Sequence, residues 1–308
     1  MRAMKTALRL IGAMSIAAVL QTVAQANPPT RQPPPTNTPQ PRTYVSGTGN
    51  DSNPCSATSP CLTFAAALAL TTAGGEIYVL NSANYGPVTI NKAVTITSEG
   101  AMGGVLATSG TAITISAGPT DVVNLRGLDI DGGNTGSVGV QFNSGQALNV
   151  QKSVIHNFSS SGINFAPSGT STLLVSDITV TNNGSNGISL SNNATGALSR
   201  LIASKNGVGI LAFGSGVSLT VTDTITGNNT YGIGASSAAV MVRNSTASNN
   251  LVGIFADQSA VVRVTQSTIT ANGTGWQATN NGQVVSFGNN TLTGNATDGA
   301  ATTTVALE

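Results

Sequence analysis

A degenerate repeat of about 22 residues runs through the C-terminal two-thirds of the 308-residue chain and constrains its fold more than any other feature. Each unit carries a glycine followed by an aliphatic residue or, once, by tryptophan, and successive glycines lie 23, 25, 22, 23, 21 and 22 residues apart. This period indicates a solenoid, because each unit buries its apolar edge only against its neighbours. The pairs are Gly139-Val140, Gly162-Ile163, Gly187-Ile188, Gly209-Ile210, Gly232-Ile233, Gly253-Ile254 and Gly275-Trp276.

Within the repeat, an aliphatic residue stands eight positions before the anchor aliphatic residue in four units, and an asparagine-bearing turn lies between them. Asparagine tolerates left-handed backbone geometry and hydrogen-bonds nearby main chain. We therefore expect asparagine side chains to stack from coil to coil as a hydrogen-bonded ladder. The aliphatic pairs are Ile155/Ile163, Val180/Ile188, Ile202/Ile210 and Ile225/Ile233, and the turns hold Asn157, Asn182-Asn183, Asn206, Asn228-Asn229, Asn249-Asn250 and Asn272.

The segments before the regular repeat also favour short strands over helices. Residues 76–80, 86–90, 93–97 and 112–115 alternate apolar and polar side chains, as strands buried on one side do. The run from Cys61 to Thr72 is rich in Ala and Leu and predicts a short helix. Because an exposed terminal strand invites edge-to-edge association, we expect this helix to cap the first coil.

Composition excludes several classes of protein. Only 7% of residues are charged and 40% are hydrophobic, whereas disordered chains combine low hydrophobicity with high charge. The formal net charge is +1, so there is no large basic field to attract nucleic acid or anionic lipid. We expect neither as a partner.

The N-terminal region is typical of an exported protein. Residues 1–26 predict a signal peptide, with basic residues, an apolar stretch from Leu10 to Leu20 and the small-x-small sequence Ala24-Gln25-Ala26. The apolar stretch is shorter than the roughly 20 residues that span a bilayer, so no integral membrane segment is expected after cleavage. The predicted location is secreted, periplasmic or cell-surface.

The next two segments are expected to be a spacer and a cap. Residues 27–42 contain seven prolines and favour an extended polyproline II spacer. The solenoid domain is expected over 43–308, with an N-terminal cap over 43–75. Cys55 and Cys61 lie in the cap, and in an oxidising compartment their even number and close spacing favour a disulfide over two free thiols.

The chain from Thr43 through Ala300 resembles the right-handed parallel β-helix family, the pectin-lyase-like group. The resemblance is carried by TYVSGTGNDSNPC, PCLTFAAALAL and GGEIYVL at the front, and by recurrent coils such as VSDITVTNNGSNGI. It implies an all-β fold, a single-stranded right-handed parallel β-helix with three parallel sheets, about ten coils and a short N-terminal capping helix. The fold hosts lyases, hydrolases, epimerases and non-enzymes, so it implies no single activity.

Catalytic elements of related enzymes are missing from this sequence. The NTD, DD, GHG and RIK elements of polygalacturonase-like hydrolases do not occur, nor does the DPH element of alginate-epimerase-like proteins, and the chain has one histidine. The candidate catalytic patch is Asp129, Asp131, Lys152 and His156, because two successive coils bring them together and a carboxylate–histidine pair acts as a general base or binds a metal. The alternative is that they are solvated turn residues.

Charged residues recur at one turn of successive coils with alternating sign. Stacked like charges would lie about 4.8 Å apart, so alternation avoids repulsion between coils. A functional interpretation of the same row is a polar groove for an acidic glycan. The row is Lys152, Asp177, Arg200, Asp223 and Arg243.

The candidate binding residues are Arg200 and Arg243 from this row, together with Tyr231 and Trp276, because aromatic rings on a β-helix face stack on sugars. Trp276 replaces an anchor aliphatic residue, so core packing is its alternative role. The leading hypothesis is an exported, monomeric, non-catalytic scaffold that binds extracellular polysaccharide or mediates adhesion, with no metal and no cofactor. The alternative is a divergent carbohydrate-active enzyme, a polysaccharide lyase or glycoside hydrolase.

Overall fold

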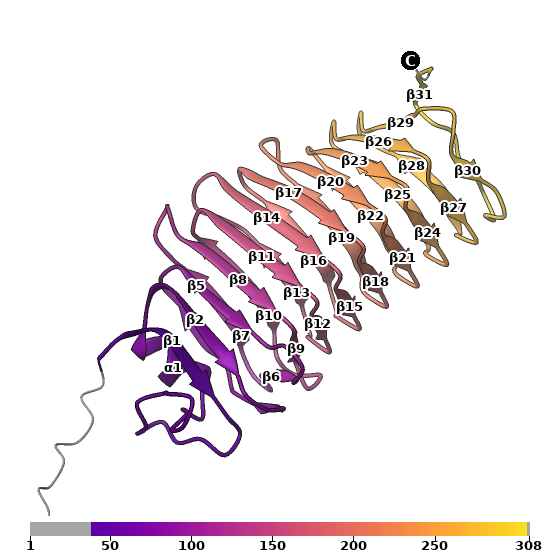
Figure 1. Cartoon of the computed structure of the whole chain (residues 1–308). Helices are drawn as coiled ribbons and strands as arrows, with labels where there is room; N and C mark the ends of the chain where they lie inside the picture. The colour runs from indigo at the N-terminus through magenta and orange to yellow at the C-terminus, as the bar shows by residue number, and fades with distance from the viewer. Residues whose placement is uncertain (1–37, 307–308) are drawn as a thin grey trace, which may run out of the picture. The chain divides into compact units, whose positions relative to one another are not determined.

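The computed structural model describes residues 38–306, and the expected signal peptide and most of the expected spacer lie outside them. The described chain is a parallel β-solenoid built from three sheets of 12, 9 and 10 strands. Each regular coil adds one strand to each sheet, and Figure 1 shows successive coils side by side from the indigo to the yellow end. The expected all-β fold with three parallel sheets and one short helix is confirmed.

The strands of the first sheet, sheet 1, are β1 (Gln40–Val45), β2 (Thr71–Val79), β5 (Val94–Thr97), β8 (Val122–Arg126), β11 (Ala147–Gln151), β14 (Ser171–Ser176), β17 (Ala194–Ser199), β20 (Ser218–Thr222), β23 (Ala239–Arg243), β26 (Val261–Thr265), β29 (Gln283–Ser286) and β31 (Thr303–Thr304). Strand β1 begins inside the range assigned to the spacer.

The strands of sheet 2 are β4 (Val88–Ile90), β7 (Thr111–Ser116), β10 (Val138–Ser144), β13 (Ser161–Phe165), β16 (Asn186–Ser191), β19 (Val208–Phe213), β22 (Tyr231–Ser236), β25 (Val252–Asp257) and β28 (Thr274–Ala278). The strands of sheet 3 are β3 (Ala83–Asn84), β6 (Gly103–Leu106), β9 (Leu128–Asp131), β12 (Val154–His156), β15 (Thr179–Thr181), β18 (Ile202–Ser204), β21 (Ile225–Gly227), β24 (Thr246–Ser248), β27 (Thr268–Thr270) and β30 (Thr291–Leu292).

The anchor residues of the repeat form one buried column along sheet 2. The column runs in register from Ile113 through the aliphatic anchors to Trp276, and each member is at most 5% exposed. The preceding glycines are required by close packing, because a Cβ atom on Gly209 would lie 2.6 Å from the carbonyl oxygen of Gly232 in the next coil. The repeat therefore records where neighbouring coils approach most closely.

The expected asparagine ladder is present, and the structure divides the asparagines between two roles. In each Asn-Asn turn the first residue, such as Asn182 or Asn228, has a left-handed backbone with φ near +57° to +59°. The second residue is buried, and its side-chain amide donates to the Oδ1 atom of the next ladder residue. Asn157 belongs to the first class, and Phe158 stands in the ladder position of that coil. The ladder is Asn183, Asn206, Asn229, Asn250, Asn272 and Asn295.

Of the aliphatic residues eight positions before the anchor, Ile155 and Val180 are fully buried. Ile202 and Ile225 are instead 44% and 48% exposed. Strand pairing places Ala203 and Thr226 at the buried position instead. The later coils are one residue shorter between these two positions, so the aliphatic residue at the expected spacing faces outward.

The N-terminal end of the stack is closed by α1 (Phe64–Leu70), the one helix among residues 38–306. The helix is shorter than predicted because it begins after the Thr63 cap, whose Oγ1 accepts from the Ala66 N–H, and because Thr71 already starts β2. Phe64, the first residue of the helix, packs against Tyr85 with ring centroids 5.1 Å apart. The helix covers strands that would otherwise be open, as expected.

The expected disulfide between Cys55 and Cys61 is formed, and both residues are fully buried. The bridged loop is hydrogen-bonded to β1, because the Tyr44 N–H donates to the Cys55 carbonyl and the Cys61 N–H donates to the Tyr44 carbonyl. The disulfide therefore fixes the loop that borders the first strand of the solenoid.

Candidate functional site

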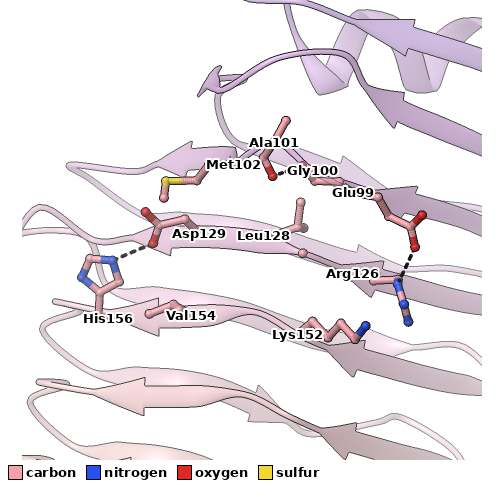
Figure 2. Close-up of a pocket in the computed structure, with 12 residues that line it drawn as sticks. Glu99, Gly100, Ala101, Met102, Arg126, Leu128, Asp129, Lys152, Val154 and His156 are labelled. Atoms are coloured by element: carbon pink, nitrogen blue, oxygen red, sulfur yellow. Dashed lines mark hydrogen bonds and ion pairs between the residues drawn. The ribbon is translucent and has the colours of Figure 1, made fainter.

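A surface cleft of about 740 Å³ opens between the loop at residues 98–102, the turn after β8 and strands β9 and β12. Three of the four predicted catalytic candidates line it: Asp129, Lys152 and His156. Asp131 lies beside a smaller depression of about 270 Å³, and Asp129 lines both. Asp129, Asp131 and His156 therefore lie close together, whereas Lys152 lies at the other end of the cleft (Figure 2).

The hydrogen bonds of His156 define one end of the cleft. Its Nε2 atom lies 2.8 Å from Oδ1 of Asp129, and its Nδ1 atom lies 2.7 Å from the Asn157 amide nitrogen. An amide nitrogen only donates, so Nδ1 accepts and the ring proton sits on Nε2, which donates to Asp129. Strand pairing sets Asp131 directly opposite His156, yet its Oδ1 atom is farther away, 3.7 Å from Nδ1.

The Asp131 carboxylate is held by neighbouring hydrogen-bond donors. Burial raises its pKa, but hydrogen bonds from the Gly133 N–H and the Asn157 amide, together with nearby His156, outweigh that effect and lower the pKa below the ordinary 3.8. The Asn157 Oδ1 atom in turn accepts from the Asn182 amide. A series of hydrogen bonds across three successive coils therefore fixes the orientation of the histidine ring.

The opposite end of the cleft is cationic (Figure 2). The Nε atom of Arg126 donates to Glu99 at 3.1 Å, and its Nη1 atom donates to Gln151 at 2.9 Å. Among residues 38–306, the Lys152 ammonium makes no hydrogen bond and no ion pair. Lys152 is near enough to Asp177 in the next coil to contribute to lowering the pKa of that carboxyl, but it forms no ion pair with it.

Apolar side chains form the middle of the cleft between its two polar ends (Figure 2). Met102 is 55% exposed and Val154 is 40% exposed, while Leu128 is buried beneath them. The cleft therefore offers an apolar surface flanked by a histidine–carboxylate pair and a cationic group.

Sequence reasoning did not single out most of the cleft lining, which includes Glu99, Met102 and Arg126. Glu99 and Met102 come from an irregular loop that carries no repeat signal. Arg126 could have been found from the sequence, because it occupies the same position in its coil as Gln151 does in the next coil, immediately before the turn that holds Lys152.

The four predicted binding residues do not form one site. Arg200 forms an ion pair with Asp177, in which its Nε and Nη2 atoms lie 2.7 and 2.9 Å from the two carboxylate oxygens. Tyr231 packs against Phe255 on sheet 2, with ring centroids 5.0 Å apart. Trp276 is only 5% exposed and ends the anchor column, so its ring belongs to the core and is not a sugar platform.

The sign-alternating row is present for four coils and then ends. Lys152, Asp177, Arg200 and Asp223 all occupy a left-handed turn position with φ between +48° and +58°. The prediction that Arg243 is the fifth member is wrong. The residue at the equivalent turn position is Asn244, with φ of +46°, and Arg243 is the last residue of β23. A shorter coil shifted the spacing by one residue.

Arg243 lines two adjoining grooves of about 630 and 610 Å³ on the C-terminal side of sheet 1. Within residues 38–306, no cluster of three or more His, Cys, Asp or Glu side chains is arranged to hold a metal ion. In the same part of the chain, no helix has the length and apolar character needed to cross a membrane.

Comparison with known proteins identifies the fold. The family model described as "Right handed beta helix region" matches residues 138–297. No curated protein sequence matches the chain. Among solved structures, the complex of XylC with xylose is similar with a TM-score of 0.63 at 9% identity, covering 81% of this chain and 69% of the other.

Two further structures are similar over comparable lengths. The pectate lyase Pel9A has a TM-score of 0.54 at 15% identity, covering 82% of this chain and 73% of the other. A rhamnogalacturonan lyase has a TM-score of 0.52 at 13% identity, covering 75% and 76%. At these low identities the structural similarity shows a common fold alone, and the family match spans more than half of the chain. The chain therefore belongs to the family of proteins with a right-handed β-helix region.

Proposed function

We propose that this protein is an exported, non-catalytic β-helix that binds an acidic extracellular polysaccharide in the cleft between Arg126 and His156. The observation that carries the proposal is the arrangement of the cleft: an apolar middle, a histidine–carboxylate pair at one end and, at the other, the Lys152 ammonium, which forms no ion pair within residues 38–306. Sugar rings present apolar C–H faces and polar edges, and uronic acids add a carboxylate.

Each part of the cleft has a chemical counterpart in such a ligand. The sugar face would contact Met102 and Val154, whose side chains are exposed. Ring hydroxyls would donate to Asp129, and a uronate carboxylate would accept a charge-assisted hydrogen bond from Lys152. The fold is consistent with this proposal, because structures of similar fold include a pectate lyase, a rhamnogalacturonan lyase and a xylose complex.

The hydrogen bonds of His156 support a non-catalytic role for this side chain. Its Nδ1 atom lies 2.7 Å from the Asn157 amide nitrogen and its Nε2 atom 2.8 Å from Asp129, so both ring nitrogens already have hydrogen-bond partners within the protein. A general base needs a free acceptor within hydrogen-bond reach of the substrate proton. This side chain therefore acts as a fixed part of the cleft wall.

The proposal is tested by titrating the purified protein with oligogalacturonate and with neutral xylo-oligosaccharide in a calorimeter. We expect oligogalacturonate to bind and Lys152→Gln to weaken it about tenfold, because a charge-assisted hydrogen bond contributes about 1.5 kcal/mol. Gln suits this turn, since the equivalent Gln266 has φ of +51°. Lys205→Asn is the matched control, because it removes one exposed cation outside the cleft at a position that is Asn in neighbouring coils.

Equal affinity for the neutral glycan, or equal effects of Lys152→Gln and Lys205→Asn, would contradict binding of an acidic glycan in this cleft. Failure of both glycan classes to bind would contradict the polysaccharide proposal itself.

A second candidate function is a carbohydrate-active enzyme at the same cleft, a lyase or hydrolase. The observation that favours it is the 2.8 Å contact between Asp129 and His156 in the wall of an open cleft. Incubating the protein with uronate and neutral polysaccharides and measuring chain length separates the two functions. Depolymerisation that is abolished by Asp129→Asn or Asp131→Ala would establish the enzyme and refute the non-catalytic scaffold.

A further inference from the structure

A second groove lies on the same edge of the solenoid as the cleft, far along the stack. The two adjoining depressions around Arg243 share Thr222, Arg243 and Gln266. One depression contains Asp223 and is unfavourable for an anion. The other is lined by Met241 and Phe287 together with threonine hydroxyls and amides, and no carboxylate lines it.

The Arg243 side chain is exposed, and among residues 38–306 only its Nε atom has a hydrogen-bond partner. Its Nε atom donates to Oε1 of Gln266 at 3.1 Å. Within residues 38–306, its two Nη groups make no hydrogen bond and no ion pair, so they are available to a ligand. A guanidinium with free Nη groups beside a half-buried aromatic ring is suited to a carboxylate carried on a ring, because it donates two parallel hydrogen bonds.

Arg243 and Arg126 occupy the same position of their coils. Strand pairing in sheet 1 connects them in register through Gln151, Ser176, Ser199 and Thr222. Five strand spacings separate the two arginines, which corresponds to about 24 Å along the stack. The cleft and the groove therefore lie on one line.

The surface between the two arginines does not form a continuous cationic path. Arg200 is neutralised by Asp177, and Asp223 accepts a hydrogen bond from Asn244. Arg126 is likewise paired with Glu99, so along this line of residues the cations that form no ion pair within residues 38–306 are Lys152 in the cleft and Arg243 in the groove. An anionic chain held at both would cross an intervening surface on which the charges are paired or hydrogen-bonded.

We infer that the groove formed by Arg243, Met241 and Phe287 is a second binding site for a sugar carboxylate, and that one acidic polysaccharide chain spans it and the first cleft. The inference rests on the proposed function for the identity of the ligand class. Its distinct consequence is that affinity increases once an oligosaccharide is long enough to reach both sites, because the second contact becomes intramolecular.

The experiment is a calorimetric titration of the full chain with oligogalacturonates of increasing length. Short oligomers should bind with two sites per chain, and oligomers that span about 24 Å should bind with one site and at least tenfold more tightly, a modest gain for linked sites. Arg243→Gln should leave one site for short oligomers and remove the gain with length. Gln is accommodated here, since Gln151 occupies the equivalent position.

Two variants separate failure of this inference from failure of the proposed function. Phe287→Ala should weaken the second site alone, and Lys205→Asn should change neither site. If Lys152→Gln weakens short oligomers while Arg243→Gln changes neither the number of sites nor the length dependence, the second site is refuted and the cleft stands. If Arg243→Gln abolishes all binding and Lys152→Gln has no effect, the cleft is refuted. Thermal denaturation of each variant verifies that it is folded.

Discussion

Asn229 accepts two hydrogen bonds from Asn206 in the preceding coil: the backbone N–H and the side-chain amide of Asn206 donate to Oδ1 of Asn229 at 2.9 and 3.2 Å. Both residues are buried. The same double contact recurs along the ladder, so each asparagine satisfies two donors of the coil before it. This arrangement ties consecutive coils together inside the protein.

Asn229→Ala should be strongly destabilising, because it leaves the Asn206 N–H buried without an acceptor and removes the donor to Asn250. We expect a loss of about 2–4 kcal/mol in the free energy of unfolding, measured by denaturant titration. Asn228→Gly is the matched control, since Asn228 is exposed and its left-handed backbone suits glycine. Equal losses for the two variants would contradict a structural role for the ladder.

Two buried threonines should respond in opposite directions to removal of their hydroxyl groups. Among the described residues, the Thr226 Oγ1 atom has no hydrogen-bond partner, whereas Thr224 Oγ1 donates to the Thr222 carbonyl at 2.9 Å. Thr226→Val should therefore stabilise the fold by about 1 kcal/mol, and Thr224→Val should destabilise it by a similar amount. Both variants replace a threonine hydroxyl by a methyl group. The sign of each change in unfolding free energy therefore tests whether the Thr226 hydroxyl lacks a hydrogen bond and the Thr224 hydroxyl makes one. A loss of stability in Thr226→Val would refute it.

Asp131 should contribute stability that depends on pH. Its pKa in the folded protein lies below the ordinary 3.8, so the ionised carboxylate stabilises the fold above about pH 4. This contribution is lost as the pH falls through the lower folded value. Asp131→Asn should therefore lower the melting temperature most at pH 7, and its difference from wild type should shrink as the pH falls below the ordinary 3.8. A difference that grows as the pH falls would contradict the hydrogen-bonded carboxylate described here.

Reversing one charge in the turn row should create repulsion between coils. Asp177→Lys would place three cations in adjacent coils at positions 152, 177 and 200, and it would remove the two hydrogen bonds to Arg200. We expect a lower melting temperature at low salt that is partly restored at high salt, because exposed charges are screened. Asp177→Asn is the control, since Asn244 occupies the same turn with a left-handed backbone. Salt dependence in the control equal to that of Asp177→Lys would refute repulsion as the cause.

The fold could be predicted from the sequence because its strongest constraint is periodic. The glycines of the anchor pairs recur wherever a carbonyl oxygen of the next coil leaves no room for a Cβ atom. Sequence alone did not separate Asn182 from Asn183, because both residues suit a turn. Only the alternation of side chains across the strand end decides which one points inward.

The candidate site was only partly predictable, for two physical reasons. The charge row was extended wrongly to Arg243 because coil length varies: residues paired in register along sheet 3 from Val154 to Thr246 lie 25, 23, 23 and 21 residues apart. Glu99 and Met102 belong to a loop outside the repeat, so their place in the cleft depends on tertiary structure. Asp129, Lys152 and His156 were found because they lie on two regular, adjacent coils.

The alternating turn charges give this stretch of the solenoid a unit of two coils, although its sequence repeats every coil. Looping out the single coil that carries Asp177 would stack Lys152 on Arg200, and duplicating it would stack two aspartates. Looping out or adding a pair of coils preserves the alternation. The alternation therefore disfavours a slip of one coil during folding, because such a slip would stack like charges. It also favours growth of this segment by whole pairs of coils. The residues concerned are Lys152, Asp177, Arg200 and Asp223.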